Sequence, residues 1–286
     1  MKGKTVLFVG CGDLGTRAGQ WLVAQGARVA AARRHPNGLP EEFLGYAADY
    51  TRAGDLDFIA ELDPDYVVTS FTPSQRDTHG YEQGFVASTQ LLLNALATCS
   101  VRQLVFVSST RVYAEREGGW VDESSPLVED DAAGAAIVRA ESLLDDAHFP
   151  SVRLRFGGIY GDPRGRLLRR IASGELCPKL PVSFSNRIHR IDAARSIVHC
   201  LSLADAGVEL ARSYNGVDSL PAPQYEVEYW LAMQMGLAQE ALRYTGKRMS
   251  VGHKRCRNTA LRSTGFEFEF PDYRAGYRQV LSKREP

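Results

Sequence analysis

The chain has 286 residues, which is enough for one large domain or two closely associated lobes. Apolar residues make up 44% and charged residues 24%, an ordinary globular composition that excludes an intrinsically disordered protein. Lysine plus arginine number 34, as do aspartate plus glutamate, so the formal net charge is zero. Neither nucleic acid nor an acidic membrane surface is therefore expected as the main partner.

The cysteines and histidines indicate the redox environment of the protein and whether a metal site is expected. The five cysteines are widely scattered with no Cys-x-x-Cys pair, which predicts reduced thiols in a cytoplasmic protein. The six histidines show no metal-ligand spacing, so no metal site is expected. No apolar stretch is long enough to span a bilayer, so no membrane segment is predicted.

Short apolar runs alternate with segments of helical period through the first half of the chain. The runs are continuous rather than alternating in polarity, as in strands that are buried on both faces of a parallel sheet. This alternation predicts a parallel sheet covered by helices on both faces. The predicted strands are residues 5–9, 27–32, 45–48, 66–70, 104–107 and 152–156, and the predicted helices contain residues 14–22, 81–99 and 131–146.

The pattern changes after about residue 156, where glycine, proline and arginine become more frequent. Asp192 stands at the start of a further helical segment and is expected to cap its N-terminus. The second half has the character of a smaller lobe packed on the sheet.

The first predicted strand runs into a glycine-rich turn, Gly10-Cys-Gly12-Asp-Leu-Gly15. In this GxGxxG pattern the first glycine makes a tight turn, the second lets the backbone approach a pyrophosphate, and the third allows close helix–strand packing. The N–H groups that open the helix would face the phosphates. We therefore expect a dinucleotide at this turn, held by its six residues: Gly10, Cys11, Gly12, Asp13, Leu14 and Gly15.

The end of the second predicted strand bears on which dinucleotide binds. An NAD(H) site usually places a carboxylate there, whereas this chain has Arg33 and Arg34. Guanidinium groups match a 2′-phosphate by bidentate hydrogen bonding, so NADP(H) is the expected cofactor, with NAD(H) as the alternative if the arginines only line a solvated loop. Asp49, after the third strand, would accept from the adenine amino group or form a turn.

Four later segments, in order, resemble the extended short-chain dehydrogenase/reductase family, also called the NAD-dependent epimerase/dehydratase family. They are residues 105–113 (VFVSSTRVY), 121–126 (VDESSP), 155–161 (RFGGIYG) and 187–192 (RIHRID). The resemblance implies a Rossmann-type, doubly wound parallel α/β sheet with a smaller C-terminal substrate lobe. On this basis we expect a cofactor-binding core over residues 1–161, to which 188–203 return, and a substrate lobe mainly over 162–286. Thr69, Ser108 and Ser109 would complete the cofactor site.

The resemblance also implies a catalytic trio of a hydroxyl residue, a tyrosine and a lysine. Ser109 matches the hydroxyl member, but Ala133 and Ile137 stand where the family's Tyr-x-x-x-Lys pair belongs. Neither side chain can titrate, so the usual proton relay cannot operate. Tyr113 and Tyr160 are the candidate substitutes, although each could instead be a packing or anchoring aromatic.

Two functions from different classes remain open at this point. One is an NADP(H)-linked oxidoreductase or epimerase/dehydratase acting on a small polar substrate, such as a sugar nucleotide or another anion, which Thr110 and Arg190 would contact. The other is a cofactor-binding sensor or interaction protein without turnover. Family relatives often pair the helices that correspond to residues 81–99 and 131–146, which implies a homodimer.

Overall fold

The computed structural model describes residues 1–244 and 252–283, and its contacts divide the chain into two compact units. Unit 1 comprises Met1–Val112, Leu127–Arg155 and Ala194–Tyr214, and unit 2 comprises Tyr113–Pro126, Phe156–Ala193 and Asn215–Pro286. These boundaries differ from the expected core of 1–161, because residues 113–126 and 156–161 cluster with unit 2. The assignment of one part to the cofactor and the other to the substrate stays a prediction.

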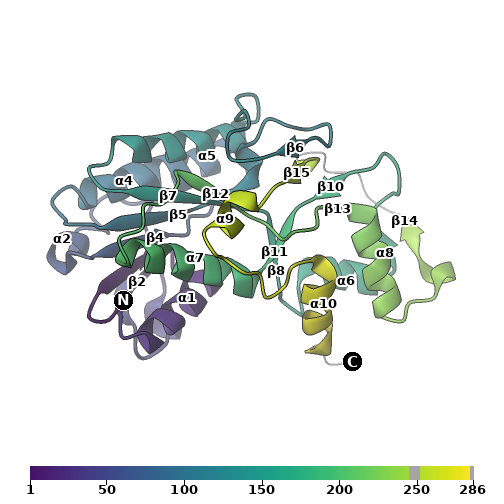
Figure 1. The fold of residues 1–286 in the computed structure, drawn as a ribbon, viewed down its shortest axis with the longest axis horizontal. Coiled ribbons are helices and arrows are strands. Elements are labelled where there is room, and N and C mark those ends of the chain that lie inside the picture. The colour runs from purple at the N-terminus through teal and green to yellow at the C-terminus, as the bar shows by residue number, and fades with distance from the viewer. Residues whose placement is uncertain (245–251, 284–286) are drawn as a thin grey trace. The chain divides into compact units, whose positions relative to one another are not determined.

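Unit 1 is built on a seven-stranded sheet in the order β12-β7-β5-β4-β1-β2-β3 (Figure 1). The pairs β1–β2, β1–β4, β2–β3 and β4–β5 are parallel. The inner strands are almost entirely buried, as expected of continuous apolar strands, whereas β3 at the edge of the sheet is largely exposed. The strands are β1 (Thr5–Val9), β2 (Arg28–Arg33), β3 (Leu44–Ala47), β4 (Tyr66–Thr69), β5 (Gln103–Ser109), β7 (Ser151–Phe156) and β12 (Ser213–Gly216).

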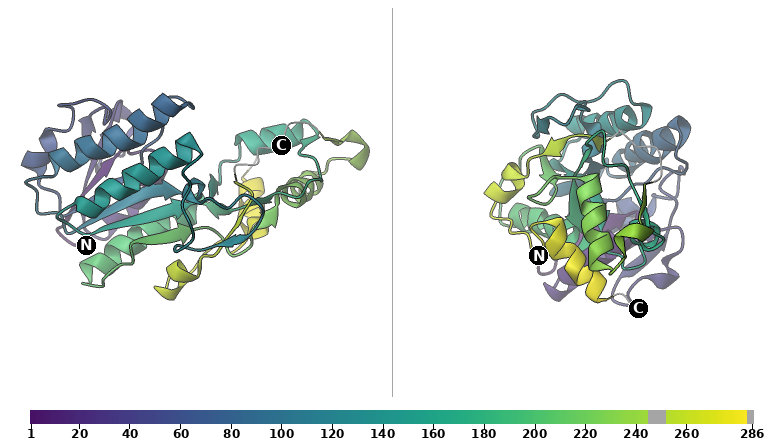
Figure 2. Two further views of the ribbon diagram at one scale, coloured as in Figure 1. Left: turned by 90° about the horizontal axis from the view of Figure 1, so that it is seen from above. Right: turned by 90° about the vertical axis from the view of Figure 1, so that its right-hand side faces the viewer.

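Helices cover both faces of this sheet, as Figures 1 and 2 show. One face carries α4 (Ser88–Ala95) and α5 (Ala132–Leu143), and the other carries α1 (Asp13–Ala24) and α7 (Arg190–Asp205). The short helix α2 (Phe58–Leu62) precedes β4. The expected doubly wound parallel sheet is therefore confirmed, and the fold is of the Rossmann type. None of the helices in residues 1–244 and 252–283 combines the length and apolar character that crossing a bilayer requires.

The predicted helix over residues 81–99 is interrupted. It consists of α3 (Thr78–Tyr81), a π-helical segment, Glu82–Ala87, and then α4. A Cβ atom on Gly84 would lie 2.6 Å from the Thr72 carbonyl oxygen, so this segment presses directly on the loop after β4. The Ser88 hydroxyl donates to the Gln83 carbonyl oxygen at 2.8 Å, five residues back, which stabilises the wider turn.

One further expectation needs correction, and one strand was not predicted. Asp192 does not cap a helix, because α7 already begins at Arg190. Its buried carboxylate instead accepts hydrogen bonds from the backbone N–H groups of Glu269 and Phe270, at 2.9 and 2.8 Å. Strand β12 was not predicted, because its sequence, Ser-Tyr-Asn-Gly, is polar although all four residues are buried.

In the part of unit 2 that the structure describes, short strands accompany four further helices. Its apolar core gathers Leu168 and Ile171 of α6, Val227 and Leu231 of α8, and Val280 of α10. The strands are β6 (Trp120–Val121), β8 (Gly158–Tyr160), β9 (Glu175–Leu176), β10 (Phe184–Ser185), β11 (Arg187–His189), β13 (Ala222–Pro223), β14 (Arg243–Tyr244) and β15 (Arg255–Cys256), and the helices are α6 (Arg166–Ala172), α8 (Gln224–Gln234), α9 (Thr259–Ser263) and α10 (Tyr273–Ser282).

Candidate functional site

The glycine turn at the end of β1 has the geometry that its sequence predicts. Gly10 has a φ of +81°, and a Cβ atom there would lie 2.6 Å from the Ser70 carbonyl oxygen. A Cβ atom on Gly15 would lie 3.0 Å from Cys11 Sγ, so this glycine permits close packing of α1 on the turn. Gly12 differs, because a Cβ atom there would meet no described atom within 4 Å. The fold requires Gly10 and Gly15, whereas Gly12 leaves open space at the start of α1.

The remaining turn residues present backbone rather than side chains to that space. Cys11 and Leu14 are buried, and burial raises the pKa of the Cys11 thiol to about 11 despite the lowering influence of Thr16 and Arg33. The Asp13 carboxylate receives two hydrogen bonds from Arg17, each of 2.9 Å. The first N–H groups of α1 have no acceptor within the helix, so they are the groups that a pyrophosphate would meet.

The end of β2 lies directly beside this turn. The Ala32 carbonyl oxygen accepts from the N–H groups of Gly10 and Cys11, at 3.0 and 3.2 Å. Arg33, the next residue, is half-buried and its charge reaches the Cys11 thiol, while Arg34 is exposed. Neither guanidinium forms an ion pair with a carboxylate among the described residues. Both positive charges therefore remain available beside the cradle.

Asp49 forms a turn after β3. Its Oδ1 accepts hydrogen bonds from the backbone N–H and the hydroxyl of Thr51, at 3.1 and 2.7 Å. Burial raises the pKa of this carboxyl, but the Thr51 hydrogen bonds and the charges of Arg34 and Arg52 outweigh burial and lower it below its ordinary value. These contacts support the interpretation of Asp49 as a turn-forming residue. A hydrogen bond from the adenine amino group to Asp49 stays a prediction.

Thr69, at the end of β4, is a candidate ligand contact because of its unpaired hydroxyl. The residue is fully buried, and its hydroxyl has no hydrogen-bond partner within the described part of the chain. Buried polar atoms are nearly always paired in folded proteins, so an orphaned hydroxyl at a strand end is a sign of a missing partner. The open space at Gly12 and this unpaired hydroxyl are the two features that make the turn a candidate cradle for a dinucleotide.

Ser108 and Ser109, at the end of β5, have different environments. The Ser108 hydroxyl donates to Glu141 Oε1 of α5 at 2.5 Å. Glu141 also receives two hydrogen bonds from Arg155 of β7, at 3.1 and 2.7 Å, and both charged side chains are buried. The Ser109 hydroxyl accepts from the Arg111 N–H at 3.2 Å and is only half-buried. Ser108 thus serves a buried ion pair, while Ser109 remains the candidate for contact with a substrate.

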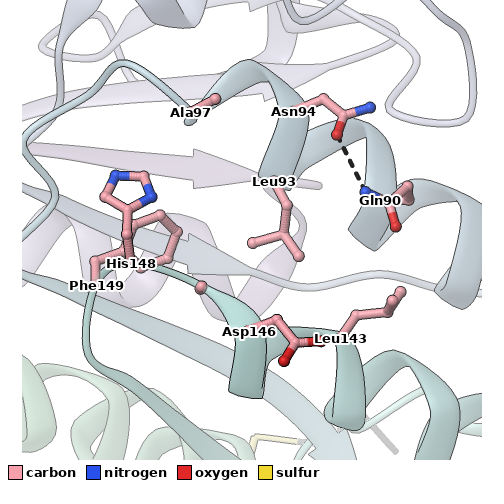
Figure 3. Close-up of a pocket in the computed structure, with 9 residues that line it drawn as sticks. Gln90, Leu93, Asn94, Ala97, Leu143, Asp146, His148 and Phe149 are labelled. Atoms are coloured by element: carbon pink, nitrogen blue, oxygen red, sulfur yellow. Dashed lines mark hydrogen bonds between the residues drawn. The ribbon is translucent and has the colours of Figure 1, made fainter.

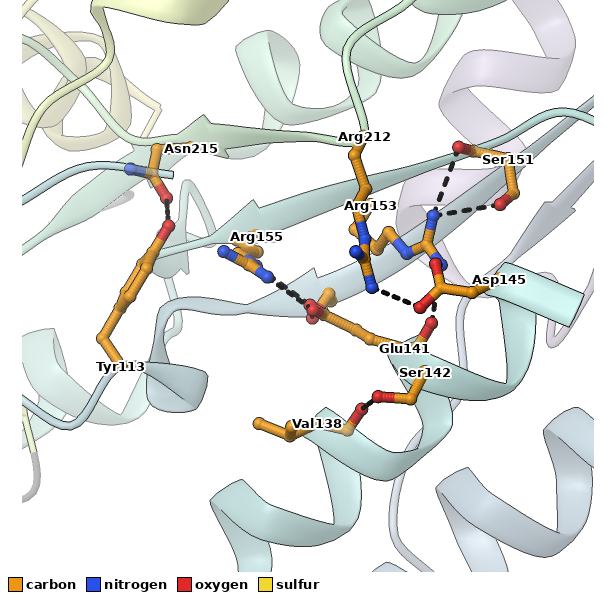
Figure 4. Close-up of polar contacts among 11 residues, drawn as sticks. Tyr113, Val138, Glu141, Ser142, Asp145, Ser151, Arg153, Arg155, Arg212 and Asn215 are labelled. Atoms are coloured by element: carbon orange, nitrogen blue, oxygen red, sulfur yellow. Dashed lines mark hydrogen bonds and ion pairs between the residues drawn. The ribbon is translucent and has the colours of Figure 1, made fainter. Parts of the chain in front are cut away.

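Further charged contacts lie next to this ion pair, nearer the beginning of β7. Arg153 donates to the Glu141 carbonyl oxygen and to Asp145 Oδ1, each at 2.6 Å, and Arg212 also pairs with Asp145. Figure 4 shows these side chains joining α5 and the strand β7. This network fixes α5 on the sheet beside Ser108.

The start of α5 is where the family's tyrosine and lysine would stand. Ala133 and Ile137 are buried there, and Arg139 forms an ion pair with Glu82. Asp131 caps the helix by accepting from the Gly134 N–H at 3.1 Å. The side chain of Arg139 is thus directed to the π-helical segment and ties it to α5.

Arg111 and Tyr81 join this neighbourhood and were not singled out by the sequence. Arg111 donates to both carboxylate oxygens of Asp131, at 2.5 and 2.8 Å, and to the Tyr81 hydroxyl at 3.4 Å. The guanidinium also lies 5.4 Å from the centre of the Tyr81 ring. Arg111 lies within the segment 105–113, but its contacts with Asp131 and Tyr81 arise only through the tertiary structure, so the sequence gives no sign of them.

The two tyrosines proposed as substitutes lie in unit 2 and are enclosed. Tyr113 is buried and donates to Asn215 Oδ1 at 2.7 Å (Figure 4). The Tyr160 ring stacks on Tyr277 at 4.3 Å, and a Cβ atom on Gly276 would lie 1.9 Å from its hydroxyl. Burial, followed by the negative charge of Asp218, raises the pKa of Tyr160. These surroundings favour the packing interpretation for both residues.

Thr110 and Arg190, the predicted substrate contacts, both begin a helical segment. Thr110 opens the 3-10 turn Thr110–Val112, and Arg190 is the first residue of α7. A Cβ atom on Gly161 would lie 2.7 Å from Arg190 Cγ, so the aliphatic part of this side chain packs on the backbone of the loop after β8. Of the other arginines in unit 2, Arg170 pairs with the buried Glu228 and Arg187 donates to Gln224. Both guanidinium groups therefore bind side chains of unit 2.

Asp218 adds a titratable group to the surroundings of Tyr160. Burial raises the pKa of its carboxyl to about 7, although the Leu220 N–H and the Arg187 charge oppose this shift. One carboxylate oxygen has no hydrogen-bond partner among the residues that the structure describes. The folded state thus holds a proton on Asp218 that the unfolded chain releases above about pH 4.

This proton predicts a pH dependence of stability. The contribution of Asp218 is fully present below about pH 4 and is lost progressively as the pH rises to about 7, because the unfolded chain then binds fewer protons than the folded one. Asp218→Asn should remove this slope. The free energy of unfolding of the variant, relative to that of the unaltered protein, should therefore increase between pH 5 and pH 8 when both are measured by urea denaturation. A constant difference across that range would show that the carboxyl does not titrate there.

A cavity of about 290 Å³ lies elsewhere in unit 1 (Figure 3). It is lined by α4 and by the segment that follows α5, including Asn94, Asp146, His148 and Phe149. None of the predicted site residues lines it, so the cavity is separate from the cofactor cradle. No group of three or more potential metal ligands is present in residues 1–244 and 252–283.

Comparison with solved structures places this geometry in a family. A protein from Methylobacillus flagellatus, provisionally assigned as an NAD-dependent epimerase/dehydratase, is 32% identical over 98% of both chains, with a TM-score of 0.82. The chain belongs to the NAD-dependent epimerase/dehydratase family. A UDP-glucose 4-epimerase from Thermus thermophilus, solved in complex with NAD, shares the family fold at 20% identity, covering 97% of this chain and 98% of its own, with a TM-score of 0.80.

A third similar structure, from Silicibacter pomeroyi, is a conserved protein of unknown function that is 24% identical over 98% of both chains, with a TM-score of 0.76. No protein-family profile matches the sequence. No curated protein sequence matches it either. This chain therefore has the fold of the epimerase/dehydratase family and the glycine turn after β1, and the placement of Ala133 and Ile137 at the positions of the usual titratable pair stays a prediction.

Proposed function

We propose that the protein is an NADP(H)-linked oxidoreductase or epimerase/dehydratase acting on a small polar substrate, of which a sugar nucleotide or another anionic molecule is the leading class. The observation that carries the proposal is the cradle beside Gly12, flanked by the two arginines that end β2 and by the orphaned hydroxyl of Thr69. When bound, the nicotinamide supplies hydride transfer to or from a substrate carbon.

The residues of the chain have separable roles in this proposal. The backbone of residues 10–15 holds the pyrophosphate, and Arg33 and Arg34 hold the 2′-phosphate. Ser109 positions the substrate oxygen, because its hydroxyl stands at the end of β5 and is only half-buried. The relative from Thermus thermophilus is in complex with NAD. The arginines of this chain are what favour the phosphorylated cofactor instead.

Removing those arginines should change cofactor preference. Arg33→Ala combined with Arg34→Ala should raise the Kd for NADP+ about 10- to 100-fold, because charge-assisted hydrogen bonds to the phosphate are lost. The Kd for NAD+ should change less than about twofold, since that molecule lacks the 2′-phosphate. Isothermal titration with both nucleotides measures the two constants.

A matched control is Arg28→Ala, at the exposed start of the same strand, which should leave both constants unchanged. Tighter binding of NAD+ than NADP+ by the unaltered protein would contradict the proposed preference. Equal losses for both nucleotides in the double variant would show that the arginines do not recognise the 2′-phosphate.

A second function, cofactor binding without turnover, is favoured by one observation, the replacement of the Tyr-x-x-x-Lys pair by Ala133 and Ile137. Two screens separate these functions, because epimerisation and dehydration regenerate the cofactor: NADPH oxidation with carbonyl substrates, and conversion of sugar nucleotides in the presence of NADP+ followed by chromatography. Activity in either screen that falls in Ser109→Ala supports the enzyme, whereas binding of the cofactor with no conversion in both screens supports the sensor. Pairing through α4 and α5 into a homodimer, and a cytoplasmic location, stay predictions.

A further inference from the structure

Three kinds of functional group meet at the end of β5. Ser109 provides an aliphatic hydroxyl, Tyr81 a phenol and Arg111 a fixed positive charge. Arg111 links the other two, because its backbone N–H donates to the Ser109 hydroxyl at 3.2 Å and its guanidinium donates to the Tyr81 hydroxyl at 3.4 Å. A hydroxyl, a phenol and a cation are also the groups of the trio that the family resemblance implies.

The arrangement is held in place from the side of α5. Asp131, the N-cap of α5, binds two nitrogens of the Arg111 guanidinium at 2.5 and 2.8 Å. A bidentate pair of this kind fixes the plane of the guanidinium as well as its position. The Tyr81 ring, in turn, stacks on Phe85 at 5.8 Å. Both partners of the Tyr81–Arg111 contact are therefore oriented before any substrate arrives.

The backbone at Tyr81 is also unusual. The π-helical segment, Glu82–Ala87, begins directly after it and lies against α5, where Ala133 and Ile137 stand. Single π-helical turns inside helices occur frequently at functional sites. The ion pair between Glu82 and Arg139 ties this segment to α5. Tyr81 itself ends α3, which also packs on α5, so the phenol comes from an element in contact with the helix that carries Ala133 and Ile137.

We propose that Tyr81 is the proton donor of this protein and that Arg111 supplies the positive charge that the missing lysine would provide. The inference rests on the proposed function as a reductase or epimerase/dehydratase. In the reductive direction the carbonyl carbon of the substrate receives hydride from the reduced nicotinamide, and its oxygen receives the proton of the Tyr81 hydroxyl. The carbonyl becomes an alcohol, the cofactor is oxidised, and the phenolate left beside Arg111 regains a proton from water.

The first test locates Tyr81 without any turnover. The protein is nitrated with tetranitromethane in the absence and presence of saturating NADPH, and the modified tyrosines are quantified by mass spectrometry. We expect NADPH to slow nitration of Tyr81 about tenfold or more, because the nicotinamide covers its hydroxyl. Tyr229 of α8, in unit 2, is the internal control, and its rate should not change.

The second test uses matched variants. Tyr81→Phe should lower kcat for NADPH oxidation about 100-fold or more, the usual contribution of a general acid, while the Kd for NADPH changes less than about twofold. Tyr229→Phe should leave both values unchanged. Arg111→Lys should retain more activity than Arg111→Met, because the lysine keeps the positive charge beside the phenol.

The outcomes separate this inference from the proposed function. If NADPH does not bind, the binding isotherm shows directly that the proposed function fails, and the inference fails with it. If NADPH binds while Tyr81 and Tyr229 are nitrated at unchanged rates, the assignment of Tyr81 is wrong and the cofactor assignment stands. Undiminished turnover by Tyr81→Phe would also overturn the assignment.

Discussion

Arg155→Ala is expected to lower the free energy of unfolding by about 3–5 kcal/mol, because removing one member of a buried ion pair leaves the other without compensation. Arg155 and Glu141 are both buried, and two hydrogen bonds join them at 3.1 and 2.7 Å. The Ser108 hydroxyl alone cannot replace the lost guanidinium for the carboxylate. Urea denaturation at neutral pH, followed by circular dichroism, measures the loss.

Two variants make this result specific. Arg212→Ala removes a largely exposed guanidinium from the same network and should cost less than about 1 kcal/mol. The double variant Glu141→Leu/Arg155→Met should be more stable than Arg155→Ala, since replacing a buried pair by apolar groups removes the uncompensated charge. A double variant as unstable as the single one would show that packing volume, rather than charge, carries the effect.

The second large effect is expected at the glycine turn, where two neighbouring glycines should respond differently to alanine. Gly10→Ala should destabilise the fold and weaken NADPH binding together, because its φ of +81° disfavours a side chain and the added Cβ meets the Ser70 carbonyl oxygen. Gly12→Ala should change the stability by less than about 0.5 kcal/mol, since its Cβ enters open space. It should nevertheless raise the Kd for NADPH about tenfold or more.

Thermal unfolding and fluorescence titration, performed on both variants, separate folding from binding. The informative result is the Gly12→Ala variant, whose fold is intact by our expectation. If it binds NADPH as tightly as the unaltered protein, the pyrophosphate does not approach the backbone at Gly12. Normal stability of Gly10→Ala would contradict the steric argument for the turn.

The sequence predicted those features that depend on local patterns. A continuous apolar run such as Thr5–Val9 is recognisable as a buried parallel strand because almost every residue contributes to the signal. The strand Ser151–Phe156 is less typical, because its arginines, Arg153 and Arg155, are buried through ion pairs. Gly10 and Gly15 were assigned correctly because a tight turn and close helix packing each require the absence of a side chain. These requirements act within a few residues of each other along the chain.

Features that depend on distant contacts were missed. Nothing near Tyr81 in the sequence indicates that its hydroxyl meets Arg111, thirty residues later along the chain. At the π-helical turn, Gly84 lies directly against the loop after β4. The helical period of the sequence contains no information about such a contact. Asp192 was assigned as a helix cap from its position, whereas its carboxylate binds backbone groups 77 and 78 residues away.

The packing of α5 limits which side chains position 137 can hold. Ile137, where the family's lysine would stand, is 2% exposed and belongs to the core of unit 1. A lysine there would place an ammonium group in an apolar environment, which is costly unless a partner for the charge is introduced at the same time. Engineering of proton transfer into this fold is therefore expected to succeed more readily on an element other than α5.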